Sequence, residues 1–148
     1  MTSRAITKSY ISLYWRIWLA LVACLLLVRF SILFRVQAED TLFALFSCYA
    51  IPTWISIVVL NAIEGHRLME YLKHNHRQKW EYLTSGPGFG PGRMNSFRSL
   101  PFIYSNDDLA DSVVKELKTN YRRFVKLILT VFFTMLPLFI ITMPIWGS

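Results

Sequence analysis

The sequence has few charged residues and almost no cysteine. Of its 148 residues, 17% are charged, nine are acidic and two are cysteines. A soluble domain of this size is usually about one quarter charged, so the composition argues against a water-soluble enzyme. No internal repeat or low-complexity tract is visible, and the high apolar content argues against disorder.

Two cysteines are too few for a disulfide-rich scaffold. Cys24 and Cys48 both lie within long apolar stretches. We expect them to pack there as small apolar side chains rather than to form a disulfide.

Apolar residues are in excess, and they are concentrated in three stretches. They make up 54% of the chain, with a mean hydropathy of +0.38, which is more than one soluble core can bury. Residues 11–34 contain only two charges, Arg16 and Arg29, and residues 41–63 and 127–148 contain none. Each stretch is long enough to cross about 30 Å of hydrocarbon at about 1.5 Å per residue.

We therefore predict an all-α integral membrane protein with three transmembrane helices, over residues 11–34, 41–63 and 124–148. Residues 1–10 form an N-terminal tail and residues 35–40 a short link. Residues 64–123 form a helical hairpin between the second and third membrane helices, with a Gly/Pro loop over residues 85–92.

Basic residues near the helix ends predict the orientation. The short link holds one arginine beside Glu39 and Asp40, whereas the tail holds Arg4 and Lys8. The long segment holds ten basic residues: Arg67, Lys73, Arg77, Lys79, Arg93, Arg98, Lys115, Lys118, Arg122 and Arg123. The tail and the hairpin are therefore predicted to be cytoplasmic, with the link and the C-terminus in the periplasm. A basic surface next to the membrane attracts anionic lipid headgroups, so no nucleic-acid ligand is needed to explain it.

Four residues of the first membrane helix are predicted membrane anchors: Trp15, Arg16, Trp18 and Arg29. Arg16 lies in an aromatic belt from which its cation can reach the cytoplasmic headgroups. Arg29 follows roughly 20 Å further along the helix. It is expected either to reach the outer headgroups or to pair with Glu39, Asp40 or a partner subunit.

The hairpin sequence predicts two helices. The first, over residues 64–83, continues directly from the second membrane helix and carries Leu68 and Leu72 on one face. The second is expected to begin at a cap on Ser105 or Asn106, with Asp107 and Asp108 in its first turn. Its apolar residues recur at three- and four-residue steps and so form one stripe along the helix: Leu109, Val113, Leu117, Tyr121 and Phe124.

The segment between these helices is aromatic and basic, which suits a surface lying on the membrane or against a neighbouring helix. We expect contacts to a partner or to lipid from these and nearby residues: Arg93, Phe97, Arg98, Phe102, Tyr104, Arg122 and Arg123.

A catalytic or metal site is not expected. His66, Glu70 and His74 share a helix face, but their i to i+8 spacing covers about 12 Å, too far for all three to bind one ion, although either neighbouring pair could share one. The glycines of residues 86–92 lack the strand and the Gly-Lys-Ser/Thr signature of a phosphate loop. We predict no enzyme activity, no cofactor and no bound metal.

A family resemblance rests on several short runs. They are Leu68-Met69-Glu70-Tyr71-Leu72-Lys73 with His76 and Trp80, then Phe97, Leu100, Phe102-Ile103-Tyr104, Asp107-Asp108-Leu109, and Tyr121-Arg122-Arg123-Phe124 before a terminal span. This pattern resembles small bacterial inner-membrane proteins of the universal stress protein B type and related uncharacterised proteins. The resemblance implies a bacterial inner membrane and a link to stress response, and it carries over no catalytic residue. This sequence departs from that pattern because it carries an additional N-terminal membrane helix, over residues 11–34.

The predicted function is that of a non-enzymatic accessory, assembly or regulatory subunit of a larger inner-membrane complex, with another integral membrane protein as partner. The same small basic architecture would also serve an immunity or antitoxin protein that neutralises a membrane-acting toxin. A lipid-modifying enzyme using His66, Glu70 and His74 is the third alternative.

Overall fold

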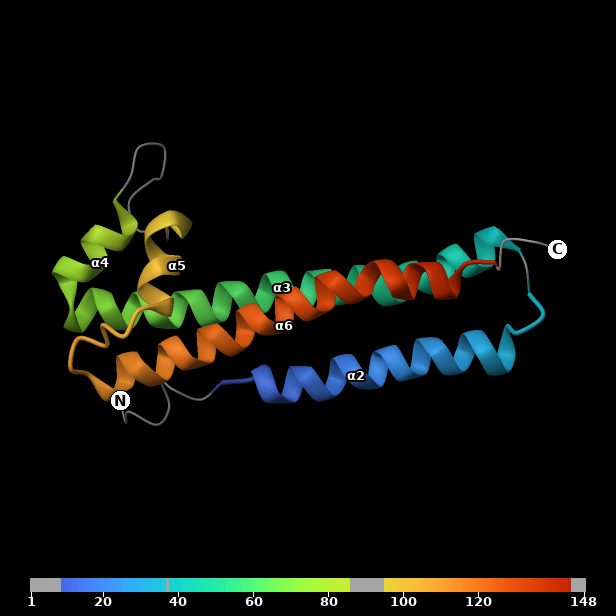
Figure 1. Cartoon of the computed structure of the whole chain (residues 1–148), viewed down its shortest axis with the longest axis horizontal. Coiled ribbons are helices and arrows are strands. Elements are labelled where there is room, and N and C mark those ends of the chain that lie inside the picture. Colours follow the sequence, from blue (N-terminus) through green and yellow to red (C-terminus); the bar gives the residue numbers. More distant parts are fainter. Residues whose placement is uncertain (1–8, 37, 86–94, 145–148) are drawn as a thin grey trace. The chain divides into compact units, whose positions relative to one another are not determined.

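The computed structural model describes residues 9–36, 38–85 and 95–144, and these residues form helices and no strand. The helices are α2 (Ile11–Leu27), the π-helical turn η1 (Val28–Ile32), α3 (Glu39–Asn75), α4 (Arg77–Thr84), α5 (Ser96–Tyr104) and α6 (Ser112–Thr142) (Figure 1). The predicted all-α class is confirmed over these ranges.

Three helical segments are long and apolar enough to cross a membrane. They are Ile11–Ile32, Glu39–Asn75 and Ser112–Thr142, and only 17% to 22% of the residues in their most apolar windows are buried. Such exposed apolar surface suits contact with hydrocarbon rather than water. Three helices with the length and apolar character of the predicted membrane helices are therefore present, and the second and third continue beyond their apolar stretches into polar sequence.

The chain divides into two compact units. The polar unit comprises residues 1–9 and 60–125, and the span unit comprises residues 10–59 and 126–148. The long helices α3 and α6 contribute to both units.

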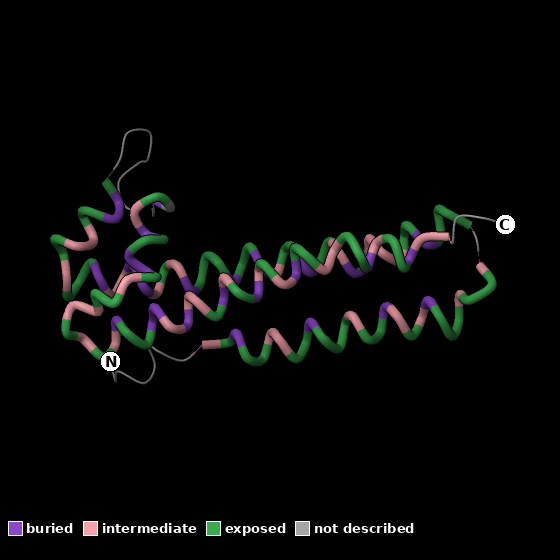
Figure 2. Tube along the Cα trace, viewed as in Figure 1, coloured by how far each residue is buried: buried purple, intermediate pink, exposed green. Residues whose placement is uncertain are grey.

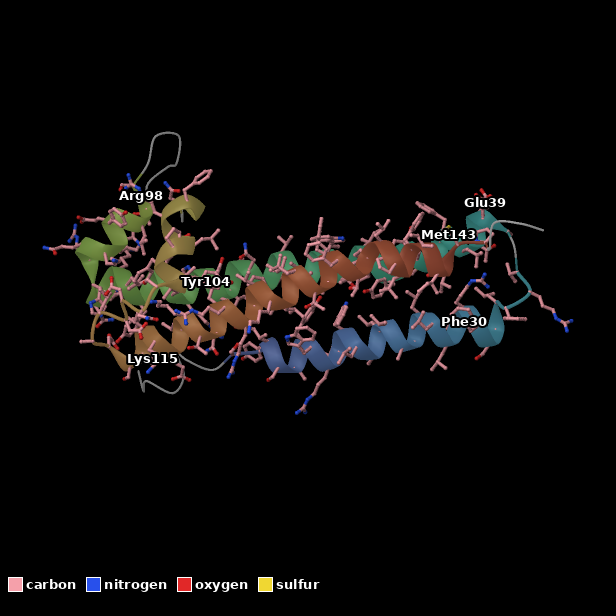
Figure 3. All side chains as sticks on the ribbon, viewed as in Figure 1. Phe30, Glu39, Arg98, Tyr104, Lys115 and Met143 are labelled. Atoms are coloured by element: carbon pink, nitrogen blue, oxygen red, sulfur yellow. The ribbon has the colours of Figure 1, made fainter. Side chains whose placement is uncertain are left out.

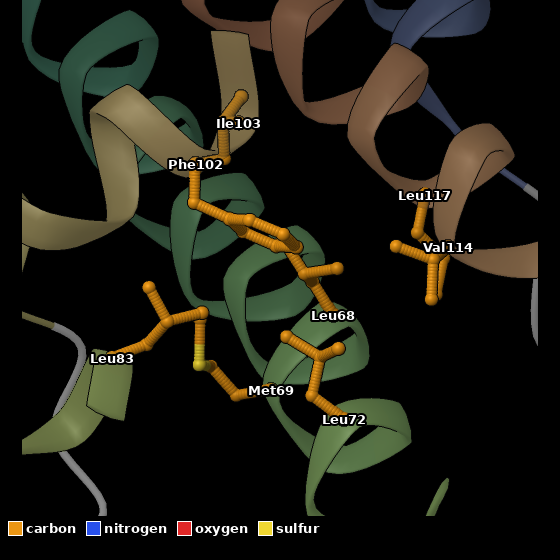
Figure 4. Close-up of a cluster of buried hydrophobic side chains, with 8 residues drawn as sticks. All are labelled: Leu68, Met69, Leu72, Leu83, Phe102, Ile103, Val114 and Leu117. Atoms are coloured by element: carbon orange, nitrogen blue, oxygen red, sulfur yellow. The ribbon is translucent and has the colours of Figure 1, made fainter. Parts of the chain in front are cut away.

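The core of the polar unit draws side chains from four helices (Figure 4). Helix α3 supplies three, α4 supplies one, α5 supplies two and α6 supplies two: Leu68, Met69, Leu72, Leu83, Phe102, Ile103, Val114 and Leu117. Burial of one such side chain stabilises a fold by about 1.5 to 3 kcal/mol. The predicted two-helix hairpin thus needs correction, because α4 and α5 are separate helices that complete its core.

The first hairpin helix is interrupted at His76. Here φ is −138° and ψ is 58°, outside the helical region, so α3 ends at Asn75 and α4 begins at Arg77. The predicted continuous helix over residues 64–83 is therefore wrong. The break redirects the chain and allows Leu83 to join the core formed by Leu68 and Leu72.

Helix α6 begins later than predicted. Leu109 and Ala110 both have a φ of 54°, a left-handed conformation that disfavours helix in residues with a Cβ atom. The Asp111 carboxylate then accepts a hydrogen bond from the amide of Val113 at 2.8 Å, which is the geometry of an N-cap. Asp107 and Asp108 consequently lie in the preceding turns rather than in the helix.

In the span unit, the buried residues of α2 form a narrow stripe. Ile11, Trp18 and Leu25 are buried at intervals of seven residues, a spacing that keeps one side of a helix against its neighbours. Figure 2 shows this recurrence along α2. The Trp18 indole donates a hydrogen bond to the Tyr49 hydroxyl at 2.9 Å, which links α2 to α3.

Candidate functional site

A polar cluster joins α3, the break at His76 and the start of α6. The Tyr71 hydroxyl donates a hydrogen bond to Asp111 Oδ2 at 2.8 Å, and His76 Nε2 lies 2.9 Å from the same oxygen. The other carboxylate oxygen of Asp111 caps α6 through Val113. Both oxygens of this carboxylate are therefore bound within the polar unit.

The electrostatics of this cluster favour a charged Asp111 and a neutral Tyr71. Burial acts to raise the pKa of Asp111. Hydrogen bonds from His76, Tyr71 and the backbone amides have the larger combined effect, so the pKa of Asp111 lies below its ordinary value. Burial and the neighbouring carboxylate raise the pKa of Tyr71. Asp111 is thus a fixed hydrogen-bond acceptor for two side-chain donors, Tyr71 and His76. This cluster was not predicted from the sequence.

A second cluster is centred on Lys118, whose side chain is 1% exposed. Its Nζ donates hydrogen bonds to the carbonyls of Ser105 and Asp107, at 2.9 and 3.0 Å, and lies 3.0 Å from Asp108 Oδ1. The same ammonium lies 4.5 Å from the centre of the Phe102 ring. Lys118 therefore holds the turn before α6, which explains why Asp107 and Asp108 lie outside the helix.

Lys79 binds the same turn from α4. Its Nζ lies 2.8 Å from Asp107 Oδ2 and 4.7 Å from the centre of the Phe102 ring. The hydrogen bond from Lys79 is the main reason why the pKa of Asp107 is lowered.

Arg122 was predicted to contact a partner or lipid, and the structure engages it internally. Its Nε donates a hydrogen bond to the Ile103 carbonyl at 2.7 Å, and its Nη2 donates to the Ser105 carbonyl at 2.8 Å. Its guanidinium lies 5.9 Å from the centre of the Tyr104 ring. Arg122 thus fastens the C-terminal end of α5 to α6, whereas Arg123 beside it is exposed.

Arg98, labelled in Figure 3, has a similar internal role. Its Nη1 donates hydrogen bonds to Ser85 Oγ at 2.6 Å and to the Tyr82 carbonyl at 3.1 Å. The guanidinium also lies 4.9 Å from the centre of the Tyr82 ring. Arg98 therefore ties α5 to the end of α4. Arg93, the other basic residue predicted in this segment, lies outside the described residues.

The aromatic residues of α5 separate onto two faces. Phe97 is 85% exposed and Tyr104 is 52% exposed, whereas Phe102 is 5% exposed and belongs to the core. At about 100° per residue, Phe102 lies about 140° around the helix from Phe97. The prediction that Phe102 contacts a partner or lipid is corrected on this ground, while Phe97 and Tyr104 remain available for such contacts.

The histidines considered for a metal site are not assembled into one. His66 is exposed, and His74 Nδ1 lies 3.6 Å from Glu70 Oε1 on an exposed face. Over residues 9–36, 38–85 and 95–144, no group of three histidine, cysteine or acidic side chains is placed to hold a metal ion.

In the span unit, Arg29 has a role that neither predicted alternative described. It is 3% exposed, and it donates hydrogen bonds to the carbonyls of Thr142 at 2.9 Å and Leu33 at 2.8 Å. These carbonyls lie at the C-terminal ends of α6 and of η1, where helices leave acceptors unsatisfied. Its side chain therefore binds the ends of two helices.

The other predicted anchors of α2 differ in exposure. Arg16 is exposed and Trp15 is half-buried, with the Trp15 ring 5.5 Å from that of Trp18. Trp18 is buried against α3, so it contributes to helix packing rather than to an exposed aromatic belt. Cys24 and Cys48 are free cysteines, and both are exposed rather than packed in a core.

Comparison of the chain with protein-family models, with curated proteins and with solved structures finds no match.

Proposed function

We propose that this protein is a non-enzymatic accessory, assembly or regulatory subunit of a larger complex in a bacterial inner membrane, with another integral membrane protein as its partner. In this proposal the chain crosses the membrane three times. The polar unit is cytoplasmic and the C-terminus is periplasmic.

The observation that carries this proposal is that side chains able to do chemistry are used to hold the polar unit together. Both oxygens of Asp111 are bound internally. The ammonium of Lys118 and the guanidinium of Arg122 bind backbone carbonyls. Groups committed in this way define the shape of a small domain, which suits recognition of a partner better than turnover of a substrate.

The orientation is supported by the distribution of charge. The segment between the second and third apolar helices holds ten basic residues, whereas the link between the first and second holds one. Basic residues near membrane helices favour the cytoplasmic side. A reporter active only in the periplasm should therefore give no signal when fused after residue 88 and full signal when fused after residue 148. The reverse pattern would overturn the orientation.

The partner is tested by photo-crosslinking in living cells. A photoreactive amino acid is placed in turn at Leu19, Ile55 and Phe133, which are exposed on the three apolar helices, and at Val131, which is fully buried, as the control. We expect at least one exposed position to give a discrete product with one other integral membrane protein, and Val131 to give none. Removal of the chain should shift that protein to a smaller species on a native gel.

Two outcomes would contradict the proposal. The first is that all three exposed positions yield lipid adducts alone. The second is that the purified protein alters a phospholipid in a reaction abolished by His66→Ala or Glu70→Ala, which would favour the lipid-modifying enzyme.

A further inference from the structure

We propose that α5 is an interfacial helix whose exposed apolar face inserts into the headgroup boundary of the membrane that the chain spans. The occupant of this face is lipid, and the inference depends on the membrane-spanning helices but not on the proposed partner protein.

The first line of support is the reversed amphipathicity of α5. Its inward face holds Ser99, Phe102 and Ile103, all buried. The outward face carries apolar residues at i, i+3, i+4 and i+7, within about 100° of arc: Phe97, Leu100, Pro101 and Tyr104, all exposed. A helix on a water-exposed surface normally turns polar residues outward. The outer face of α5 is therefore suited to an apolar environment.

The second line of support is the depth at which α5 is attached to α6. Arg122 binds the carbonyls of Ile103 and Ser105 at the C-terminal end of α5. Arg122 precedes Leu127, where the uncharged stretch of α6 begins, by five residues, or about 7.5 Å along the helix. The headgroup layer on each side of a bilayer is about 5 to 8 Å thick.

The attachment to α3 gives the same depth. Ile103 and Phe102 share the core with Leu68, which follows Ile63, the last residue of the uncharged stretch of α3, by five residues. This distance is again about 7.5 Å. Within the polar unit, α5 lies across α3 and α6 rather than along them (Figure 1). A helix that lies across α3 and α6 close to the ends of their uncharged stretches is suited to the plane of a membrane interface.

The chemistry of the outer face also suits lipid. Phe97 and Leu100 offer apolar surface to the acyl boundary, and Tyr104 combines an apolar ring with a hydroxyl, as in aromatic belts. The Arg122 guanidinium beside the Tyr104 ring supplies positive charge at the C-terminal end of α5, and Arg123, the next residue of α6, is exposed. Such charge attracts anionic headgroups.

The test uses nitroxide spin labels on the full chain in vesicles of phosphatidylcholine and phosphatidylglycerol at low protein content. The native cysteines are replaced by alanine, and single cysteines for labelling are introduced by Phe97→Cys, Leu100→Cys or Gln78→Cys. Gln78 is an exposed residue of α4 and serves as the water-facing control. Accessibility to oxygen, which concentrates in lipid, is compared with accessibility to a water-soluble nickel chelate.

We expect the labels at positions 97 and 100 to be more accessible to oxygen than to nickel, and the label at position 78 to show the opposite order. If positions 97 and 100 match position 78, the outer face of α5 lies in water and the proposal is wrong. If they are shielded from both reagents, a second copy of the chain covers the face, and lipid is likewise excluded as its occupant.

Discussion

Replacement of Lys118 by methionine should destabilise the polar unit substantially. Methionine retains an unbranched apolar side chain and removes the ammonium, which binds the Ser105 and Asp107 carbonyls and the Asp108 carboxylate. The Ser105 carbonyl keeps its hydrogen bond from Arg122. The free energy of unfolding therefore falls for two reasons. The Asp107 carbonyl loses its donor, at a cost of about 1 to 3 kcal/mol, and the partly exposed ion pair with Asp108 is lost, at a cost of up to about 1 kcal/mol.

A net loss of about 1 to 4 kcal/mol corresponds to a roughly 5- to 800-fold increase in local opening. Amide hydrogen exchange of the peptides covering residues 96–118, measured by mass spectrometry in detergent, reports that opening directly. Lys115→Met is the matched control, because Lys115 lies one turn earlier on α6 and is exposed (Figure 3). Equal exchange in the two variants would refute the structural role of Lys118.

Three further predictions concern the polar unit and the end of the span unit. Because the folded-state pKa of Asp111 is lowered, its stabilising effect is complete above the unfolded pKa of about 3.9 and is lost as pH falls through the folded value. Thermal unfolding between about pH 3 and 7 should therefore depend on pH less in Asp111→Asn than in the wild type, and equal profiles would contradict this. Arg29→Met should lower the SDS concentration at which the protein unfolds, by removing donors worth about 1 to 3 kcal/mol each, whereas Arg16→Met at an exposed position should have little effect. Leu83→Ala should cost about 2 to 5 kcal/mol in urea unfolding because it empties a core position, and a loss no larger than that of Leu100→Ala would show that Leu83 is outside the core.

The sequence was sufficient to predict the three apolar helices, because uncharged stretches of membrane length have few alternative structures. It also predicted that the second helix continues into polar sequence. It placed Leu68 and Leu72 on one helix face and Leu117 in an apolar stripe, and all three pack in the core. These features depend on local periodicity.

The features that were missed depend on contacts between residues distant in sequence. The helix break at His76 accompanies a contact with Asp111, 35 positions away. The late start of α6 accompanies the binding of Lys118 to the preceding turn. Arg29 binds the carbonyl of Thr142, 113 positions away, and no local pattern identifies that acceptor.

Phe102 shows a different limit of prediction from sequence. Its neighbours Phe97 and Tyr104 are exposed, and all three belong to one aromatic run. Helical periodicity within α5 separates them, but this requires knowing that the helix begins at Ser96 and continues through Pro101. A proline within a short segment ordinarily argues against such a helix.

We propose that this chain acts as a subunit beside an integral membrane protein. Native mass spectrometry of the full chain extracted from its own membranes in mild detergent tests it most directly. The account predicts a complex containing this chain and one other integral membrane protein at a fixed ratio. Recovery of the chain alone from gently extracted membranes, together with an intrinsic activity on phospholipid, would contradict it.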